Sequence, residues 1–158
     1  MCAKVCGVGI PMTAELNADK IRRAAPDDVP ACAKVVHDWA TQTDWMPDEL
    51  PVDELAKLIS DAFDSREMWV AGDPVDCYMS VDPAQNKIGA LYCSRTGQGI
   101  GKRLVDKAKE GRNFLWLTTH RPNTAAQRFY RREGFEVTAE EPPVPPDTVP
   151  VYRMEWRA

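Results

Sequence analysis

The chain has 158 residues, of which 44% are hydrophobic and 28% are charged, and its formal net charge is −4. That length and balance fit one globular domain with a hydrophobic core. The acidic balance argues against general nucleic-acid binding, which needs a basic surface, and no apolar run is long enough to cross a membrane. The first ten residues are too short for a secretory signal, so we expect a cytoplasmic protein.

Residues 1–18 are expected to form a flexible leader before a single domain over residues 19–158. Met12 is a second candidate for the natural start, because the globular pattern begins only near Lys20. The cysteines are odd in number and match no zinc spacing, so we expect free thiols and no bound metal. They are Cys2, Cys6, Cys32, Cys77 and Cys93. No base lies near Cys93 in the sequence, which disfavours a covalent nucleophile there.

The first half of the domain reads as a strand, two helices and a strand meander. A short strand over residues 20–24 precedes a helix that opens at Pro26 and has apolar residues at helical spacing. After a loop through Trp45, a second helix runs from Asp53 to about Phe63. Three strands follow, which we expect to pair in antiparallel order: residues 68–71, 75–81 and 87–93.

The second half alternates helices with strands. A helix begins at Gly99 and stops near Gly111, and a strand covers residues 114–119. Asn123 is expected to cap a further helix that ends at Gly134. The last strands are residues 135–139 and 150–156, joined by an extended link, residues 141–150, that holds five prolines. These elements predict a mixed α/β fold around one central sheet.

A glycine-rich segment from Thr96 to Lys102 joins a predicted strand to a predicted helix. Its glycines leave backbone amides uncovered, and the helix dipole attracts an anion such as pyrophosphate. A P-loop is excluded, because Thr96 stands at its first glycine and Arg103 at its Ser or Thr. A dinucleotide fingerprint is excluded, because Lys102 stands at its last glycine. From these residues alone, a phosphate-binding turn and a turn without ligand both remain open.

Three segments together resemble the GNAT superfamily of acyl-CoA-dependent N-acetyltransferases. Gly99 and Gly101 match the family's acyl-CoA loop, Q/R-x-x-G-x-G/A, with Thr96 in the first position. Residues 123–135 match its pattern of Asn, then Ala, then Phe-Tyr, then Gly-Phe, on the helix after the next strand. Leu-Tyr-Cys at residues 91–93 is similar to the strand before the family's loop. The resemblance runs from about residue 21 to residue 135.

The resemblance implies a mixed, mostly antiparallel central sheet with flanking helices, whose fourth and fifth strands splay apart around acetyl-CoA. The chain would then be an N-acetyltransferase acting on a primary amine of a small molecule or peptide. Tyr130 would protonate the departing thiolate, and Phe129 beside it would face the core. The residues implied in binding acetyl-CoA are Leu91, Tyr92 and Cys93 on the strand, Thr96, Gly97, Gln98, Gly99, Ile100, Gly101 and Lys102 at the pyrophosphate, and Asn123, which would contact the pantetheine or cap its helix.

The segment expected to line the acceptor site has an excess of acidic residues. Between Lys34 and Lys57 there is no Lys or Arg, and an acidic lining favours a cationic amine. We expect Asp44, Trp45 and Met46 to bind the acceptor, although the acids at positions 48, 49, 53 and 54 equally suit a helix N-terminus. The strand that ends at residue 93 departs from the family in carrying no carboxylate. The candidate general bases are therefore His37, Asp38, Asp44 and His120.

Two other functions remain open from the sequence. One is a non-catalytic module of the same fold, which binds acyl-CoA without turnover. The other is a small protein-interaction domain that uses the proline-rich link and has no cofactor. We expect a monomer or homodimer that takes an amine acceptor as its partner and binds neither nucleic acid nor membrane.

Overall fold

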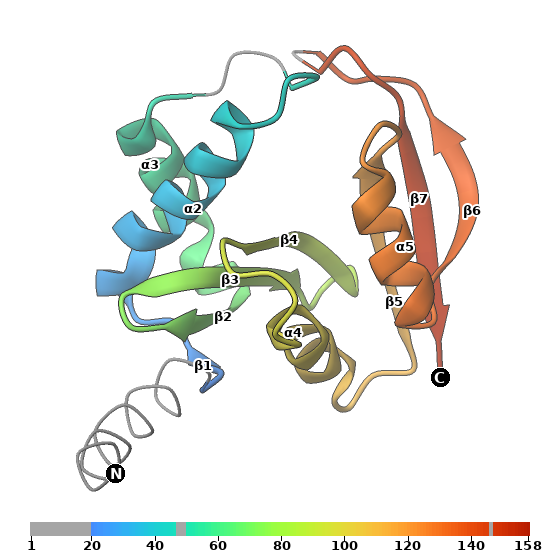
Figure 1. Cartoon of the computed structure of the whole chain (residues 1–158). Helices are drawn as coiled ribbons and strands as arrows, with labels where there is room; N and C mark the ends of the chain where they lie inside the picture. Colours follow the sequence, from blue (N-terminus) through green and yellow to red (C-terminus); the bar gives the residue numbers. More distant parts are fainter. Residues whose placement is uncertain (1–19, 47–49, 146) are drawn as a thin grey trace, which may run out of the picture.

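The computed structural model describes residues 20–46, 50–145 and 147–158 (Figure 1). The leader expected over residues 1–18 lies outside the described residues, and so do Asp48 and Glu49. Within the described ranges, no helix has the length and apolar character needed to span a membrane.

The order of elements predicted from the sequence is confirmed, with ends that shift by a few residues. The first strand is shorter than predicted, and the last one starts at Val151 because Pro150 has no N–H to donate. The elements are β1 (Arg22–Arg23), the 3-10 turn η1 (Pro26–Asp28), α2 (Val29–Thr41), α3 (Val52–Ala62), the 3-10 turn η2 (Phe63–Ser65), β2 (Glu67–Gly72), β3 (Val75–Asp82), β4 (Lys87–Cys93), α4 (Ile100–Lys109), β5 (Phe114–His120), α5 (Thr124–Arg132), β6 (Glu136–Glu141) and β7 (Val151–Arg157).

All of these strands belong to one seven-stranded sheet with the order β1-β2-β3-β4-β5-β7-β6. Every neighbouring pair is antiparallel except β4 and β5, which are parallel. These two strands pair only at Lys87 and Trp116, and they diverge beyond that point (Figure 1). The predicted mixed, mostly antiparallel sheet with splayed fourth and fifth strands is therefore confirmed.

Helices cover both faces of the sheet, because successive side chains of a strand point to opposite sides. Met68 and Val70 of β2 pack with Cys32 of α2 and Ile59 of α3 on one face. The other face carries the larger core, to which α4 and α5 contribute. Its fully buried members include Cys77, Met79, Val81, Leu104, Leu115, Leu117, Phe135 and Met154.

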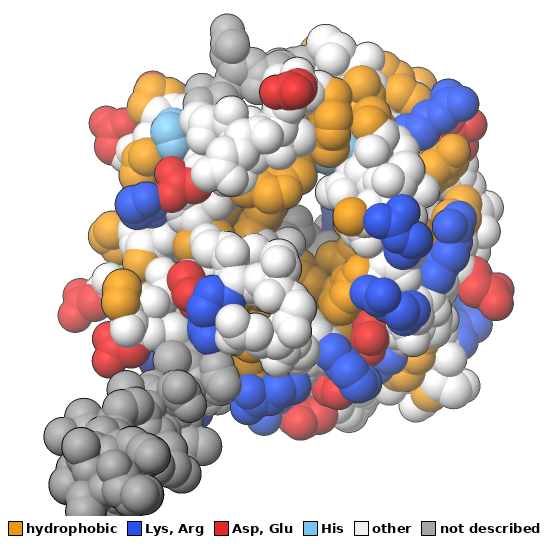
Figure 2. All heavy atoms as spheres, viewed as in Figure 1, with side chains coloured by type: hydrophobic (Ala, Val, Ile, Leu, Met, Phe, Trp, Pro, Cys, Tyr) orange, Lys and Arg blue, Asp and Glu red, His pale blue; other side chains and the backbone are white. Residues whose placement is uncertain are grey.

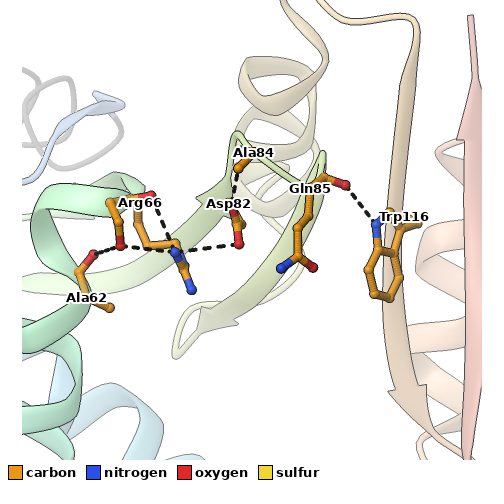
Figure 3. A network of polar contacts seen from close by, with 7 residues as sticks. Ala62, Arg66, Asp82, Ala84, Gln85 and Trp116 are labelled. Carbon is orange, nitrogen blue, oxygen red and sulfur yellow. Dashed lines mark hydrogen bonds and ion pairs between the residues drawn. The ribbon is translucent and has the colours of Figure 1, made fainter.

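Trp116 fixes the closed end of the splay (Figure 3). Its indole nitrogen donates to the Gln85 carbonyl oxygen over 2.9 Å, and its backbone N–H donates to Asn86 over 3.0 Å. The Lys87 ammonium and the Arg153 guanidinium lie over its ring, 4.7 and 3.9 Å from the centroid. A side chain of β5 thus holds the turn that leads into β4, on the outer side of the gap.

The same turn is anchored to the helical layer through a buried carboxylate. Asp82 accepts a hydrogen bond from Ala84 N over 3.0 Å and lies 3.5 Å from Arg66 Nη1 (Figure 3). Arg66 also donates to the Ser65 hydroxyl, which donates in turn to the Ala62 carbonyl oxygen. The start of β4 is therefore tied both to β5 and to the end of α3.

Candidate active site

A cavity of about 720 Å³ occupies the gap between β4 and β5, a volume in the range of small-molecule sites. Figure 2 shows the hollow near the middle of this face, with hydrophobic side chains on its walls and Lys and Arg side chains beside it. It is lined by Trp39 and by residues 88–93, 95–102, 117–120, 123, 125, 126, 129, 130, 132 and 133. Every residue that the sequence implicated in binding acetyl-CoA lies on this wall, and Tyr130 lies there too.

The backbone of β4 presents hydrogen-bonding groups to this gap. Ser94 N donates to the Asp76 carbonyl over 2.8 Å, so these two residues form a hydrogen-bonded cross-strand pair. Hydrogen-bonded and open pairs alternate along an antiparallel ladder, which makes Cys93 and Cys77 an open pair. The N–H and C=O groups of Cys93, and of Leu91 two residues earlier, consequently point away from β3 and toward the cavity.

The glycine turn lies at the N-terminus of α4. Gly97 and Gly99 have φ angles of 76° and 78°, a region that glycine tolerates best. A Cβ at either position would meet no atom within 4 Å, so the turn leaves open space where a ligand could approach its amides. Gly101 differs, since a Cβ there would lie 3.2 Å from Cζ of Phe129. The absence of a side chain at Gly101 therefore allows α4 to pack closely against α5.

The cationic side chains of the turn are held by acidic partners. Arg95 pairs with Asp76 over 2.5 Å and donates to the Gln98 side chain over 3.2 Å. Lys102 is largely exposed, and hydrogen bonds to Asp106 and then Glu133 raise its pKa. Lys102 therefore keeps its positive charge beside the helix N-terminus, where the helix dipole adds to the attraction for an anion.

Asn123 caps α5, as the sequence predicted. Its side-chain oxygen accepts a hydrogen bond from Ala126 N over 3.1 Å, which satisfies one of the free amides of the first turn. Asn123 also lies on the cavity wall, so one residue both fixes the start of α5 and borders the site.

The orientation predicted for the two aromatic residues of α5 is wrong. Tyr130 is the buried one, with 8% of its surface exposed, whereas Phe129 is only partly buried and packs beside it at 5.1 Å between centroids. Burial raises the pKa of the Tyr130 hydroxyl, so this group keeps its proton. Among the described residues, none forms a hydrogen bond with the Tyr130 hydroxyl. Tyr130 also borders the cavity.

Two thiols meet at the end of β4. Contact with Cys77 and burial raise the pKa of Cys93, which borders the cavity, whereas the pKa of Cys77 is lowered by the same contact. A thiol held in its neutral form is a weak nucleophile. This environment agrees with the sequence argument against covalent catalysis at Cys93.

The residues predicted to bind the acceptor are only partly brought together. Asp44 is exposed, and neither it nor Met46 borders the cavity. Trp45 contacts two residues that do: its ring centroid lies 5.8 Å from that of Trp39 and 5.1 Å from that of His120. Of the four candidate bases, His120 is the one on the cavity wall.

Sequence patterns did not indicate several residues that lie near this end of the cavity. The Asp147 carboxylate lies 3.3 Å from His120 Nε2, and Trp39 packs on Tyr92 with 5.3 Å between ring centroids. Gln127 on α5 is buried and donates to the carbonyls of residues 120 and 121. These contacts join residues distant in sequence, so local spacing carried no signal for them.

Comparison with known proteins agrees with this geometry. Residues 64–137 match the family model for the acetyltransferase (GNAT) domain. The peptidyl-lysine N-acetyltransferase YjaB of Salmonella typhimurium is 34% identical over 91 residues, which are 54% of this chain and 61% of that protein. The chain therefore covers about three fifths of that relative's length.

Two solved structures show the same fold. Apo YjaB of Escherichia coli superposes with a TM-score of 0.70 at 22% identity, covering 87% of this chain and 96% of that one. A phosphinothricin acetyltransferase from Sinorhizobium meliloti, solved in complex with AcCoA, gives 0.69 at 16% identity, covering 87% of each chain. The fold of this chain is thus shared with both of these proteins. The match over residues 64–137 shows that just under half of the chain is similar to the acetyltransferase (GNAT) domain.

Proposed function

We propose that this protein is an N-acetyltransferase that transfers the acetyl group of acetyl-CoA to a primary amine of a small molecule or peptide. The observation that carries the proposal is the single pairing of β4 with β5, beyond which the strands enclose a cavity bordered by the glycine turn. The relative YjaB is a peptidyl-lysine N-acetyltransferase, which supports a lysine side chain as one acceptor to test.

The residues on the cavity wall fit acetyl-CoA as donor substrate. The open turn at Gly97 and Gly99 and the ammonium of Lys102 would hold the pyrophosphate. The backbone groups of Leu91 and Cys93 that face the gap would bind the pantetheine amides as a neighbouring strand would. Asn123 would border the same arm.

Acetyl-CoA supplies the acetyl group as a thioester, which a neutral amine attacks. A β4 N–H that faces the gap would donate to the thioester oxygen as negative charge develops on it. Tyr130, which retains its proton, would donate that proton to the departing sulfur.

The proposal is tested by calorimetry with acetyl-CoA, followed by a thiol-release assay with a panel of primary amines. Gly99→Ala is expected to weaken binding at least tenfold, because it places a methyl group in the open space before the amides. Gly111→Ala is the matched control: its φ is 72°, its Cβ would also meet nothing within 4 Å, and it lies beyond the other end of α4. Equal acetyl-CoA affinity in the two variants would contradict the proposed donor site. Binding without thiol release for any amine would favour a non-catalytic module.

A further inference from the structure

Three separate segments converge on one imidazole at the open end of the cleft. His120 is the last residue of β5 and borders the cavity. Asp147, on the link between β6 and β7, places Oδ2 3.3 Å from His120 Nε2. Trp45, which follows α2, sets its ring 5.1 Å from the imidazole with an interplanar angle of 49°. The imidazole thus has a carboxylate on one nitrogen and an aromatic ring beside it.

The backbone of His120 is held from several directions. It pairs with Val151 of β7, and its carbonyl oxygen accepts from Asn123 N over 2.9 Å. The side chain of Gln127, buried on α5, donates to the same carbonyl over 3.3 Å and to that of Arg121 over 2.9 Å. A group held by a strand and a helix together loses little conformational freedom during a reaction.

The carboxylate selects the tautomer of the ring. An ionised carboxylate accepts hydrogen bonds only, so His120 presents Nε2–H to Asp147 and keeps a lone pair on Nδ1. Within the part of the chain that the structure describes, Nδ1 has no hydrogen-bond partner. The pair therefore has the arrangement in which an oriented imidazole acts as a base and the imidazolium is stabilised by the carboxylate.

The other acidic groups near the cavity are less suited to this task. Among the described residues of the wall, Glu133 is the one carboxylate, and it lies 3.4 Å from Lys102 at the glycine turn. At the end of β5, Arg121 pairs with Glu140 over 3.3 Å. Glu141 of β6 lies across β7 from His120, since both residues are in register with Val151.

We propose that His120, oriented by Asp147, accepts the proton that the acceptor ammonium must lose before it attacks; this inference rests on the proposed function. An N–H bond of the ammonium breaks and Nδ1–H forms, directly or through one water. The amine then forms its C–N bond as the C–S bond breaks. The sulfur takes a proton from Tyr130, and the second proton lost by the amine nitrogen restores Tyr130. His120 returns the first proton to solvent, so the protein is unchanged after each turnover.

The test uses steady-state kinetics with the best amine of the panel, starting from a peptide with blocked termini and a single lysine. His120→Gln is expected to lower kcat/KM about 100-fold near pH 7. The deficit should shrink as the pH approaches about 10.4, where the lysine amine deprotonates by itself. The affinity for acetyl-CoA should stay within twofold. His37→Gln is the matched control and should keep wild-type rates, because His37 does not border the cavity and so cannot act as the base there.

Asp147 is a positioning residue, and its variant gives a second readout. Asp147→Asn is expected to lower kcat/KM about tenfold, and adding it to His120→Gln should cause no further loss, because both changes disable one unit. Glu140→Gln is its matched control, since Glu140 pairs with Arg121 instead of His120. If His120→Gln proves unfolded by thermal melting, Asp147→Asn decides, because its side chain is 33% exposed on the link.

Three results would overturn the inference. They are a His120→Gln enzyme within threefold of wild type, a deficit that does not shrink with rising pH, and a double variant with additive losses. A wild-type protein that binds acetyl-CoA yet acetylates no amine would instead refute the proposed function, and this inference with it. If the wild-type protein acetylates an amine and only the His120 variants lose activity, the proposed function holds and the role of His120 is supported. The two proposals can therefore fail separately.

Discussion

The indole nitrogen of Trp116 on β5 donates to the carbonyl oxygen of Gln85 over 2.9 Å, in the turn that precedes β4. This bond lies next to the single residue pair between the two strands, so it sets where their separation begins. Trp69 provides a close comparison. Arg23 and Lys107 lie over its ring at 5.3 and 5.1 Å, but its buried indole nitrogen has no partner among the described residues.

We expect Trp116→Phe to reduce the free energy of unfolding by about 1 kcal/mol more than Trp69→Phe does. Both changes remove the same atoms from a ring flanked by two cations, and only the first removes a hydrogen bond. Urea denaturation of the two variants measures the difference. Equal losses would show that the contact with Gln85 contributes nothing to stability.

Gly101→Val is expected to destabilise the fold by about 1–3 kcal/mol, because the added side chain would press on Phe129. Any loss of acetyl-CoA affinity should then follow the altered packing of α4 on α5. Adding Phe129→Leu to the Gly101→Val protein should recover part of the stability, because it removes the ring whose Cζ would lie 3.2 Å from a Cβ at position 101. Thermal melting of the two single variants and the double variant tests this, and strictly additive losses would refute it.

Tyr130→Phe is expected to lower kcat about 100-fold while acetyl-CoA affinity and stability stay close to wild type. Its hydroxyl has no hydrogen-bond partner among the described residues, so its removal breaks no structural contact. Because burial raises the pKa of this group, Tyr130 should stay protonated up to at least its ordinary value of about 10 and add no limb to the pH profile below that value. Tyr152→Phe, on β7 and outside the cavity lining, is the control. Wild-type kcat in the Tyr130→Phe enzyme would remove the hydroxyl from the mechanism.

Cys93→Ser is expected to keep kcat within about threefold of wild type. The contact with Cys77 and burial hold the pKa of Cys93 above its ordinary value, so its thiol is neutral at working pH and does not attack the thioester. Mass spectrometry after brief exposure to acetyl-CoA should find no acetyl group on Cys93. A stable acetyl adduct there, together with a hundredfold loss in the Ser variant, would point to covalent catalysis.

Local patterns in the sequence were sufficient for much of the fold and for many of the residues that line the cavity. The turn at Gly99, the helix cap at Asn123 and the ends of β4 are each determined by the backbone preferences of a few neighbouring residues. Such preferences can be recognised in the sequence. Two adjacent aromatic residues on a helix do not reveal which one faces inward, and the prediction for Phe129 and Tyr130 failed on that point.

The surroundings of His120 depend instead on contacts between distant segments. His120 and Asp147 are 27 residues apart, and the register of β5 on β7 brings them together. Asp44 looked favourable for its charge alone, but the chain between α2 and α3 leaves it exposed, whereas Trp45 turns toward His120. Contacts of this kind depend on how distant strands align in the fold, and the spacing of neighbouring residues in the sequence does not indicate them.

The lone pairing of Lys87 with Trp116 divides the sheet into a four-stranded and a three-stranded part that share almost no backbone hydrogen bonds. Side chains of the common core join the two parts, whereas the edges of β4 and β5 beyond that pair remain open to a ligand. A molecule that bonds to both edges acts as the missing strand. Occupancy of the cleft should therefore slow amide hydrogen exchange on both sides at once and make the two parts unfold as a single cooperative unit.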